Sequence, residues 1–171
     1  MQINVAQLFK QDIGSSRSYK IDDILSFAEE EITECHIQGE VQLIRTDKGI
    51  LVKGILGGTN SLVCSRCLTS FDYPLNFRIQ EEFLPSKDIT SDIYISLPDD
   101  STTFVIDEHH ILDLNEAVRQ YALLAMPMKP LCHPHCAGIC PNCGANLNHG
   151  VCHCSHGSSE SHLSDLVRKG N

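Results

Sequence analysis

Six of the nine cysteines in this chain lie within residues 131–154, at spacings suited to binding a metal ion. Two residues separate Cys140 from Cys143, and Gly144 follows. This spacing is typical of a knuckle in which two thiolates bind one ion while backbone N–H groups point at the sulfurs, and glycine can adopt the positive φ that such a turn needs. Two more cysteines follow after a loop and complete a tetrahedral set. The sequence therefore predicts one closed, all-thiolate Zn2+ site, with the ligands Cys140, Cys143, Cys152 and Cys154.

The remaining cysteines suggest a second site of the same kind. Cys64 and Cys67 form another pair with two residues between them, and Cys132 and Cys136 lie just ahead of the first set. Together they would make a second tetrahedral set of thiolates that holds the chain after the predicted helix against the sheet. A structural zinc site of this kind supplies folding free energy on the order of 10 kcal/mol. We interpret Cys35, the ninth cysteine, as a small buried apolar residue of a strand.

Other ligand arrangements stay open at this point. Cys132 and Cys136 could pair with the knuckle at Cys140, which would leave the last two cysteines spare. Four thiolates can hold iron, alone or in an iron–sulfur cluster, as well as zinc. A histidine could replace one thiolate, and those within reach are His133, His135, His149 and His153.

Two interpretations without a metal are weaker. A disulfide framework suits small secreted proteins, whereas this chain has an odd number of cysteines, 171 residues and no export signal. A thiol redox pair at Cys64 and Cys67 would be activated by Arg66, but redox pairs normally open a helix, and a strand pattern follows here. Since no apolar run approaches twenty residues, the expected location is the cytoplasm.

The chain is acidic, with a formal charge of -9 at pH 7. Each site of four thiolates and one divalent ion adds roughly -2 to this charge. Such a chain is a poor general binder of phosphate backbone, and long-range attraction favours basic partners. With 42% hydrophobic residues it can bury one core. We expect a core domain at 1–130, a cysteine-rich metal-binding segment at 131–154 and a polar tail at 155–171 that has the apolar spacing of a short helix.

Alternating apolar residues predict the sheet that must position these cysteines. The alternation at 35–43 and the apolar run at 50–52 flank Thr46-Asp47-Lys48-Gly49, which has the composition of a hairpin turn. Residues 71–83 alternate almost without interruption and predict a long strand. A short strand is expected at the start of residues 1–9, and further strands at 61–64, 93–97 and 102–106. We also expect a loop at 15–20, a helical turn or linker at 24–32, and a bulge or turn at Gly54, Gly57 and Gly58.

One helix is predicted after the sheet. Asp113 and Glu116 are spaced as a capping box, and apolar residues recur at helical spacing until Pro127. We expect this helix to pack its apolar stripe on the sheet and to lead into the cysteine segment. The predicted fold class is α+β: a mainly antiparallel, partly barrel-like sheet with one principal helix and a zinc-bound C-terminal segment.

Two motifs carry a resemblance to a known family. The first is Cys64-Ser65-Arg66-Cys67-Leu68, and the second is Cys140-Pro141-Asn142-Cys143-Gly144-Ala145-Asn146-Leu147-Asn148. Together with the helix that ends in Ala125-Met126-Pro127, they resemble the YceD family, which is named for large ribosomal RNA subunit accumulation. The resemblance covers about Ile3 to Cys154. It implies a bacterial and plastid factor of ribosome biogenesis to which no enzymatic activity is assigned.

The expected function is therefore a non-catalytic factor that supports large-subunit rRNA accumulation by binding that rRNA or a basic ribosomal protein. The sequence shows no nucleophile with a base, no phosphate-binding glycine loop and no carboxylate pair in a defined setting, so an enzyme is not expected. The alternatives are a chaperone of a basic ribosomal protein and a thiol–disulfide redox protein. Candidate phosphate-binding residues are Arg66, Lys129, Arg168 and Lys169.

Overall fold

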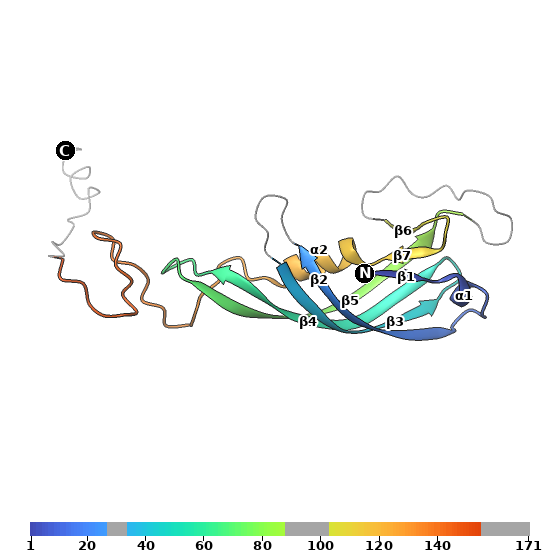
Figure 1. Cartoon of the computed structure of the whole chain (residues 1–171), viewed down its shortest axis with the longest axis horizontal. Helices are drawn as coiled ribbons and strands as arrows, with labels where there is room; N and C mark the ends of the chain where they lie inside the picture. The colour runs from blue at the N-terminus through green and yellow to red at the C-terminus, as the bar shows by residue number, and fades with distance from the viewer. Residues whose placement is uncertain (27–33, 88–102, 155–171) are drawn as a thin grey trace, which may run out of the picture. The chain divides into compact units, whose positions relative to one another are not determined.

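The computed structural model describes residues 1–26, 34–87 and 103–154 (Figure 1). Contacts divide the chain into two compact units, which we call the core unit (Met1–Leu62 and Phe71–Met128) and the cysteine unit (Val63–Ser70 and the chain from Lys129 onward). The expectation that residues 1–130 and 131–154 are separate domains stays a prediction. In chain order the elements are β1 (Gln2–Asn4), α1 (Ala6–Phe9), β2 (Ser16–Ser26), β3 (Glu34–Arg45), β4 (Ile50–Val63), β5 (Ser70–Pro85), β6 (Phe104–Ile106), β7 (Ile111–Asp113) and α2 (Asn115–Ala125).

The fold is α+β, as expected, but its sheet is open. Five strands are hydrogen-bonded in the order β2-β3-β4-β5-β6, and β1 and β7 form a separate antiparallel pair. β3 pairs antiparallel with both β2 and β4, whereas the short β6 runs parallel to β5. A closed barrel requires two hydrogen-bonded neighbours for every strand. Among the described residues β2 and β6 each have one neighbour in this sheet, so no closed barrel is formed there, and an open sheet is found in place of the expected barrel-like character.

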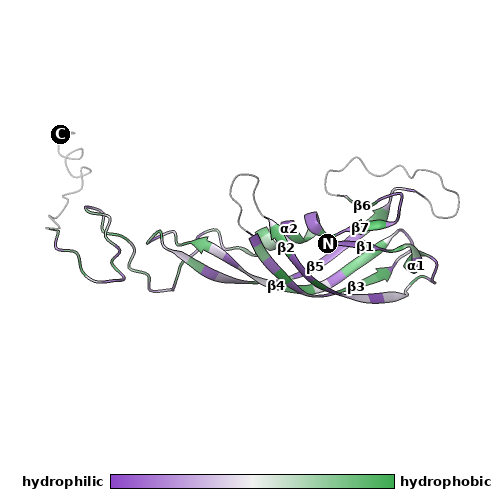
Figure 2. Ribbon diagram, in the orientation of Figure 1, coloured by the Kyte–Doolittle hydropathy of each residue, from purple (hydrophilic) through white to green (hydrophobic). Residues whose placement is uncertain are grey.

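Alternation of apolar and polar residues builds the core, as predicted from the sequence. On β3, Cys35, Ile37, Val41 and Leu43 are buried, and exposed residues stand between them. Figure 2 shows apolar and polar residues interleaved along the long strands. Successive side chains of a strand point to opposite faces, so this pattern gives each strand one face for the core and one for solvent. The burial of Cys35 agrees with its interpretation as an apolar core residue.

Helix α2 lies along the sheet and confirms the predicted helix (Figure 1). It buries Ala117, Val118 and Ala122 in the core, and it ends at Ala125, ahead of Pro127. Its start keeps the Asp113 half of the expected capping box, because the Asp113 carboxylate accepts the N–H of Asn115 at 2.9 Å. The Glu116 carboxylate instead accepts hydrogen bonds from Arg119, which hold the pKa of Glu116 down at about 2.

The glycines of β4 do not form the expected bulge or turn. β4 runs unbroken from Ile50 to Val63 through all three of them. A Cβ atom on Gly54 would lie 2.6 Å from the carbonyl oxygen of Glu40, and one on Gly58 would meet the carbonyl oxygen of His36. Glycine is therefore needed here for the close approach of the β3 backbone.

One of two expectations near the N-terminus is wrong. The short strand expected at the start of residues 1–9 is found as β1 and is followed by α1, whereas the loop expected at 15–20 belongs almost entirely to β2. Every residue of β2 pairs with a residue of β3. This pairing makes β2 a strand, although its polar sequence does not predict one. The strand at 102–106 is found as β6, and that at 61–64 is the end of β4. The strand expected at 93–97 and most of the turn or linker at 24–32 lie outside the described residues.

Candidate metal centres

Eight cysteines gather into two groups of four, both in the cysteine unit. In each group the Sγ atoms lie within 4.8 Å of one another. Four sulfurs bound to zinc at about 2.3 Å stand about 3.8 Å apart in a tetrahedron. The Sγ atoms are 3.7 Å apart between Cys64 and Cys136 and 3.6 Å apart between Cys67 and Cys132. We call the group Cys64, Cys67, Cys132 and Cys136 the inner centre, and the group Cys140, Cys143, Cys152 and Cys154 the outer centre.

The outer centre begins with a knuckle of the predicted form. The Gly144 N–H donates to the Cys140 carbonyl at 2.9 Å, and the Cys140 N–H donates to the Ala145 carbonyl at 2.8 Å. Gly144 has a φ of 72°, the left-handed conformation that the sequence predicted for it. The turn thus holds the Cys140 and Cys143 sulfurs on one side, and the Cys152 Sγ lies 3.3 Å from that of Cys140.

The inner centre repeats this knuckle with a different residue at the left-handed position. The Leu68 N–H donates to the Cys64 carbonyl at 2.9 Å, and the Cys64 N–H donates to the Thr69 carbonyl at 3.0 Å. Leu68 therefore takes the place of Gly144 and has a φ of 59°, although a left-handed conformation costs a non-glycine residue roughly 1–2 kcal/mol. The same two hydrogen bonds at the same spacing show that both pairs form the same turn.

The first thiol of each knuckle ionises readily. Burial opposes ionisation of Cys64, but backbone N–H groups of Cys67, Cys132 and Arg66 outweigh it and lower the Cys64 pKa to about 5. Backbone N–H groups of Cys143 and Asn142 lower the pKa of Cys140 to about 6. All of these N–H groups except that of Cys132 belong to the knuckles themselves, where such groups point at the sulfurs.

One thiol in each set resists ionisation. Burial and the neighbouring Cys67 thiol raise the pKa of Cys132 to about 12. A hydrogen bond with Cys143, followed by burial, raises the pKa of Cys154 to about 12. Four like charges cannot share so small a space without a cation, and a divalent ion supplies that charge. The donor set therefore fits Zn2+, which four thiolates bind in closed structural sites.

The two centres differ in exposure. Three inner sulfur residues are buried, whereas Cys143 of the outer centre is exposed and its partners Cys152 and Cys154 are half-buried. The inner centre also joins two distant segments, because the Ser65 N–H donates to the Pro130 carbonyl at 2.8 Å. An ion in the inner centre would be shielded from water more than one in the outer centre.

The alternative ligands and roles considered for the cysteines find no support in these groups. Neither group includes a histidine, and the four neighbouring histidines are exposed. No disulfide joins any of the nine cysteines, all of which lie in the described residues. The pair at Cys64 and Cys67 lies in a turn between β4 and β5 rather than at the start of a helix. This placement departs from the usual setting of a thiol redox pair.

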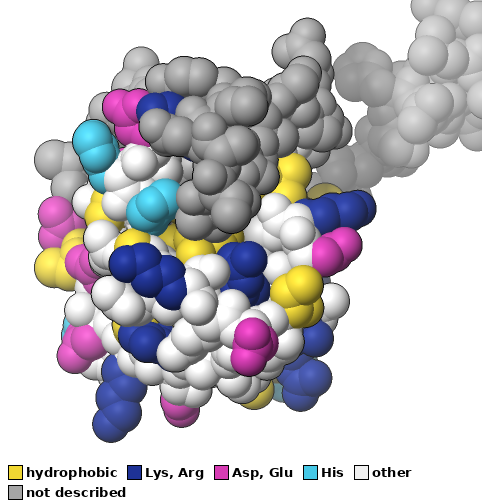
Figure 3. Space-filling view, turned by 90° about the vertical axis from the view of Figure 1, so that its right-hand side faces the viewer, with side chains coloured by type: hydrophobic (Ala, Val, Ile, Leu, Met, Phe, Trp, Pro, Cys, Tyr) yellow, Lys and Arg dark blue, Asp and Glu magenta, His cyan; other side chains and the backbone are white. Residues whose placement is uncertain are grey.

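The predicted phosphate-binding residues are only partly described. Arg66 donates from Nη1 to the Cys136 carbonyl at 3.0 Å, so its side chain is tied to the inner centre, and Lys129 is exposed. Arg168 and Lys169 lie outside the described residues. Figure 3 shows a face of the core unit on which Lys and Arg side chains are scattered, with Asp and Glu side chains between and beside them. No basic surface stands out on this view of the described residues.

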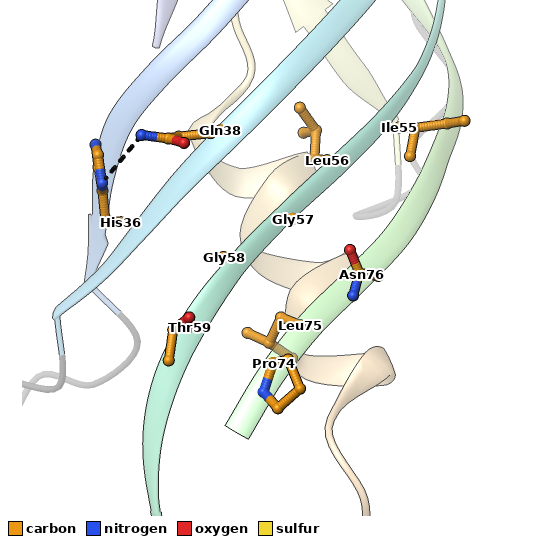
Figure 4. A pocket seen from close by; sticks show the side chains of 10 residues that line it. All are labelled: His36, Gln38, Ile55, Leu56, Gly57, Gly58, Thr59, Pro74, Leu75 and Asn76. Carbon is orange, nitrogen blue, oxygen red and sulfur yellow. Dashed lines mark hydrogen bonds between the residues drawn. The ribbon is translucent and has the colours of Figure 1, made fainter. Parts of the chain in front are cut away.

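The core unit has a hollow of its own, lined by residues of β3, β4 and β5 (Figure 4). Gly57 and Gly58 form part of its wall, and its polar groups include the His36 imidazole and the Asn76 amide. The imidazole Nε2 is 2.5 Å from the Asp22 carboxylate, and its Nδ1 lies 3.4 Å from the Gln38 amide nitrogen. Because this imidazole is already held on both nitrogens, we take the metal centres as the stronger candidate site.

In the described ranges, no helix has the length and apolar character needed to span a membrane.

Comparison with known proteins gives one family and several relatives. A family model described as "Large ribosomal RNA subunit accumulation protein YceD" matches residues 52–167. Uncharacterized proteins of Mycobacterium bovis and Mycobacterium tuberculosis are 27% identical to the chain over 108 residues, which cover 63% of this chain and 50% of each relative. An uncharacterized protein of Mycobacterium leprae is 22% identical over 108 residues, 48% of its length. The chain thus spans about half the length of the curated relatives it matches. No solved structure matches it.

Proposed function

The chain belongs to the YceD family, whose description names accumulation of the large ribosomal RNA subunit, and we propose from this premise that it acts in large-subunit biogenesis without catalysing a reaction. In this proposal the chain binds large-subunit rRNA or a basic ribosomal protein, and two Zn2+ ions hold the binding surface. The observation that carries the proposal is the pair of four-cysteine groups, built on matching knuckles, within the matched residues.

Zinc would supply structure rather than reaction chemistry. Each centre has four protein ligands, which leaves no open position for water or substrate, and this is the arrangement of structural zinc sites. Arg66 illustrates how such a centre can hold a contact residue, because its guanidinium is fixed on the Cys136 carbonyl while the residue stays exposed. Remaining N–H groups of the guanidinium can contact a phosphate.

The proposal is tested by the ratio of large-subunit to small-subunit rRNA in cells. Depletion of the protein should lower this ratio, and replacement of Cys140 and Cys143 by Ser should lower it if the outer centre takes part. A matched control changes Cys35 to Ser, which removes a thiol that belongs to neither metal group. An unchanged ratio on depletion would refute the proposal.

The charge of the chain favours a second candidate, a chaperone of a basic ribosomal protein. The formal charge is -9, and two zinc centres make it more negative, so a basic protein would be attracted over a distance. Purified protein would then bind the basic partner in the absence of RNA and would not retard RNA in a gel. Binding to RNA with a steep salt dependence that Arg66→Ala reduces would favour the rRNA alternative.

A further inference from the structure

Asn148 belongs to the loop of the outer centre but contacts the inner centre. It lies between the outer ligands Cys143 and Cys152 in sequence. Its side-chain Nδ2 lies 3.3 Å from the Sγ of Cys136, an inner-centre cysteine. The Oδ1 of the same side chain accepts the N–H of Ala137 at 2.8 Å. One amide therefore links the loop of one centre to a sulfur of the other.

The orientation of this amide is fixed by its neighbours. The Ala137 backbone N–H can only donate, so the oxygen of the Asn148 amide must face it. The NH2 group then faces the Cys136 sulfur and the Asn146 Oδ1, which it approaches at 2.8 Å. The Asn148 N–H group thus donates to the Cys136 sulfur, which carries negative charge when it binds a metal.

The rest of the loop is anchored near the inner centre as well. The Leu147 N–H donates to the Gly138 carbonyl at 2.9 Å. The Asn146 Nδ2 donates to the hydroxyl of Thr69, the residue whose carbonyl closes the inner knuckle, at 3.1 Å. Gly138 has a φ of 76°, and a Cβ there would lie 3.3 Å from the Arg66 carbonyl, so the chain passes close beside the inner knuckle. The run Asn146-Leu147-Asn148 is therefore the physical connection between the two centres.

We propose that Asn148 couples the two metal centres, so that an ion in the outer centre strengthens ion binding in the inner centre. The outer ion holds Cys143 and Cys152, and with them both ends of the loop that places the Asn148 amide. That amide then donates to the Cys136 sulfur and stabilises its negative charge, as outer-shell groups do for metal ligands. By linkage, an ion in the inner centre strengthens binding in the outer centre by the same factor. The inference rests on the proposed zinc binding by both cysteine groups.

Asn148→Asp isolates the donor to sulfur. The aspartate keeps an oxygen for the Ala137 N–H but loses the N–H donor and places a carboxylate next to the sulfur. Stepwise Zn2+ titration of the metal-free full chain, read by native mass spectrometry, gives the populations with zero, one and two ions. In the wild type the one-ion species should be scarce, because the first ion helps the second. In Asn148→Asp it should accumulate, with inner-centre affinity lower by about 10- to 100-fold.

A double-mutant cycle separates coupling from independent damage. Cys140→Ser with Cys143→Ser removes the outer centre and should itself weaken the inner one, and adding Asn148→Asp should then weaken it little further. Asn142→Ala is the matched control, because this exposed residue lies in the outer knuckle and no side-chain bond to the inner centre is described for it. Circular dichroism of the zinc-loaded variants checks that each is folded.

The possible results distinguish failure of the coupling through Asn148 from failure of the proposed zinc binding. Additive losses in the cycle, or unchanged inner-centre affinity in folded Asn148→Asp, would overturn the coupling while leaving two zinc centres in place. If the wild type binds no Zn2+ at either group, the proposed metal sites themselves fail, and the coupling fails with them.

Discussion

Removing the inner centre should destabilise the core unit far more than removing the outer one. The contact between Cys67 and Cys132 closes a chain loop of 65 residues, and this loop contains β5, β6, β7 and α2. A cross-link across a loop of that length lowers the entropy of the unfolded chain by an amount worth about 4 kcal/mol. The outer pair Cys140 and Cys152 closes only 12 residues, which lie outside the core unit. The variant Cys67→Ser with Cys132→Ser is therefore expected to lose at least about 4 kcal/mol of unfolding free energy.

The assay is urea unfolding of the zinc-loaded proteins, followed by the β-sheet signal in far-ultraviolet circular dichroism. With a slope of about 2 kcal/mol per molar urea, the inner variant should unfold at a midpoint about 2 M lower than the wild type. The matched control, Cys143→Ser with Cys154→Ser, should lower the midpoint of the core unit by much less, through its coupling to the inner centre alone. Equal midpoints for the two variants would refute the argument, since it depends wholly on which chain segments each ion joins.

Three smaller effects follow from single contacts. Burial and the Glu81 carboxylate raise the pKa of Tyr121 above its usual 10.0. As the pH rises, Tyr121 therefore ionises in the unfolded chain before it does so in the folded chain. The protonated Tyr121 stabilises the fold below pH 10, and this stabilisation is lost as the pH rises through the folded-state pKa. Tyr121→Phe should cost about 1 kcal/mol at pH 8 and flatten the alkaline fall of the melting temperature, and an equally steep fall would contradict this assignment. Gly58→Ala should lower the unfolding free energy in urea by about 2–3 kcal/mol, because its Cβ meets a backbone carbonyl. Gly57→Ala should lower it less, because its Cβ first meets a side-chain amide that can move. A larger loss for Gly57→Ala than for Gly58→Ala would contradict the packing. Gly144→Ala should introduce a backbone strain of about 1 kcal/mol, since no atom crowds its Cβ and only the positive φ opposes the change. The strain should weaken Zn2+ binding at the outer centre about fivefold in a chelator competition. A loss of affinity above a hundredfold would show that more than backbone strain is involved.

The knuckles could be predicted because their signal is local. Two cysteines at a spacing of three positions, followed by glycine, specify a turn whose hydrogen bonds span six residues, and the outer knuckle has this form. The inner knuckle could be predicted from its cysteines, but the positive φ of Leu68 could not, because leucine gives no sign of a left-handed conformation. The contact of Asn148 with Cys136 was also beyond the sequence, since a polar loop residue does not show which neighbour it will meet.

The sheet was less predictable where pairing decides the structure. Glycines in β4 resemble a turn in sequence but serve the close approach of β3, and this need is visible only when both strands are in place. β2 is polar on most of its length and is a strand because β3 pairs with it from Ser16 to Ser26. The alternation of apolar and polar residues along β3 and β5, by contrast, predicts which face of the sheet each side chain occupies. Both strands lie where this pattern predicted them.

The distance in sequence between the two halves of the inner centre also sets an order of events during synthesis. Cys64 and Cys67 leave the translating ribosome first, and their two partners follow only after β5, β6, β7 and α2 have been made. Until then the early pair can offer an ion only half of a tetrahedron. A nascent chain that stops before Cys136 cannot complete the inner centre, so full coordination there marks a chain whose core unit has been made to its end.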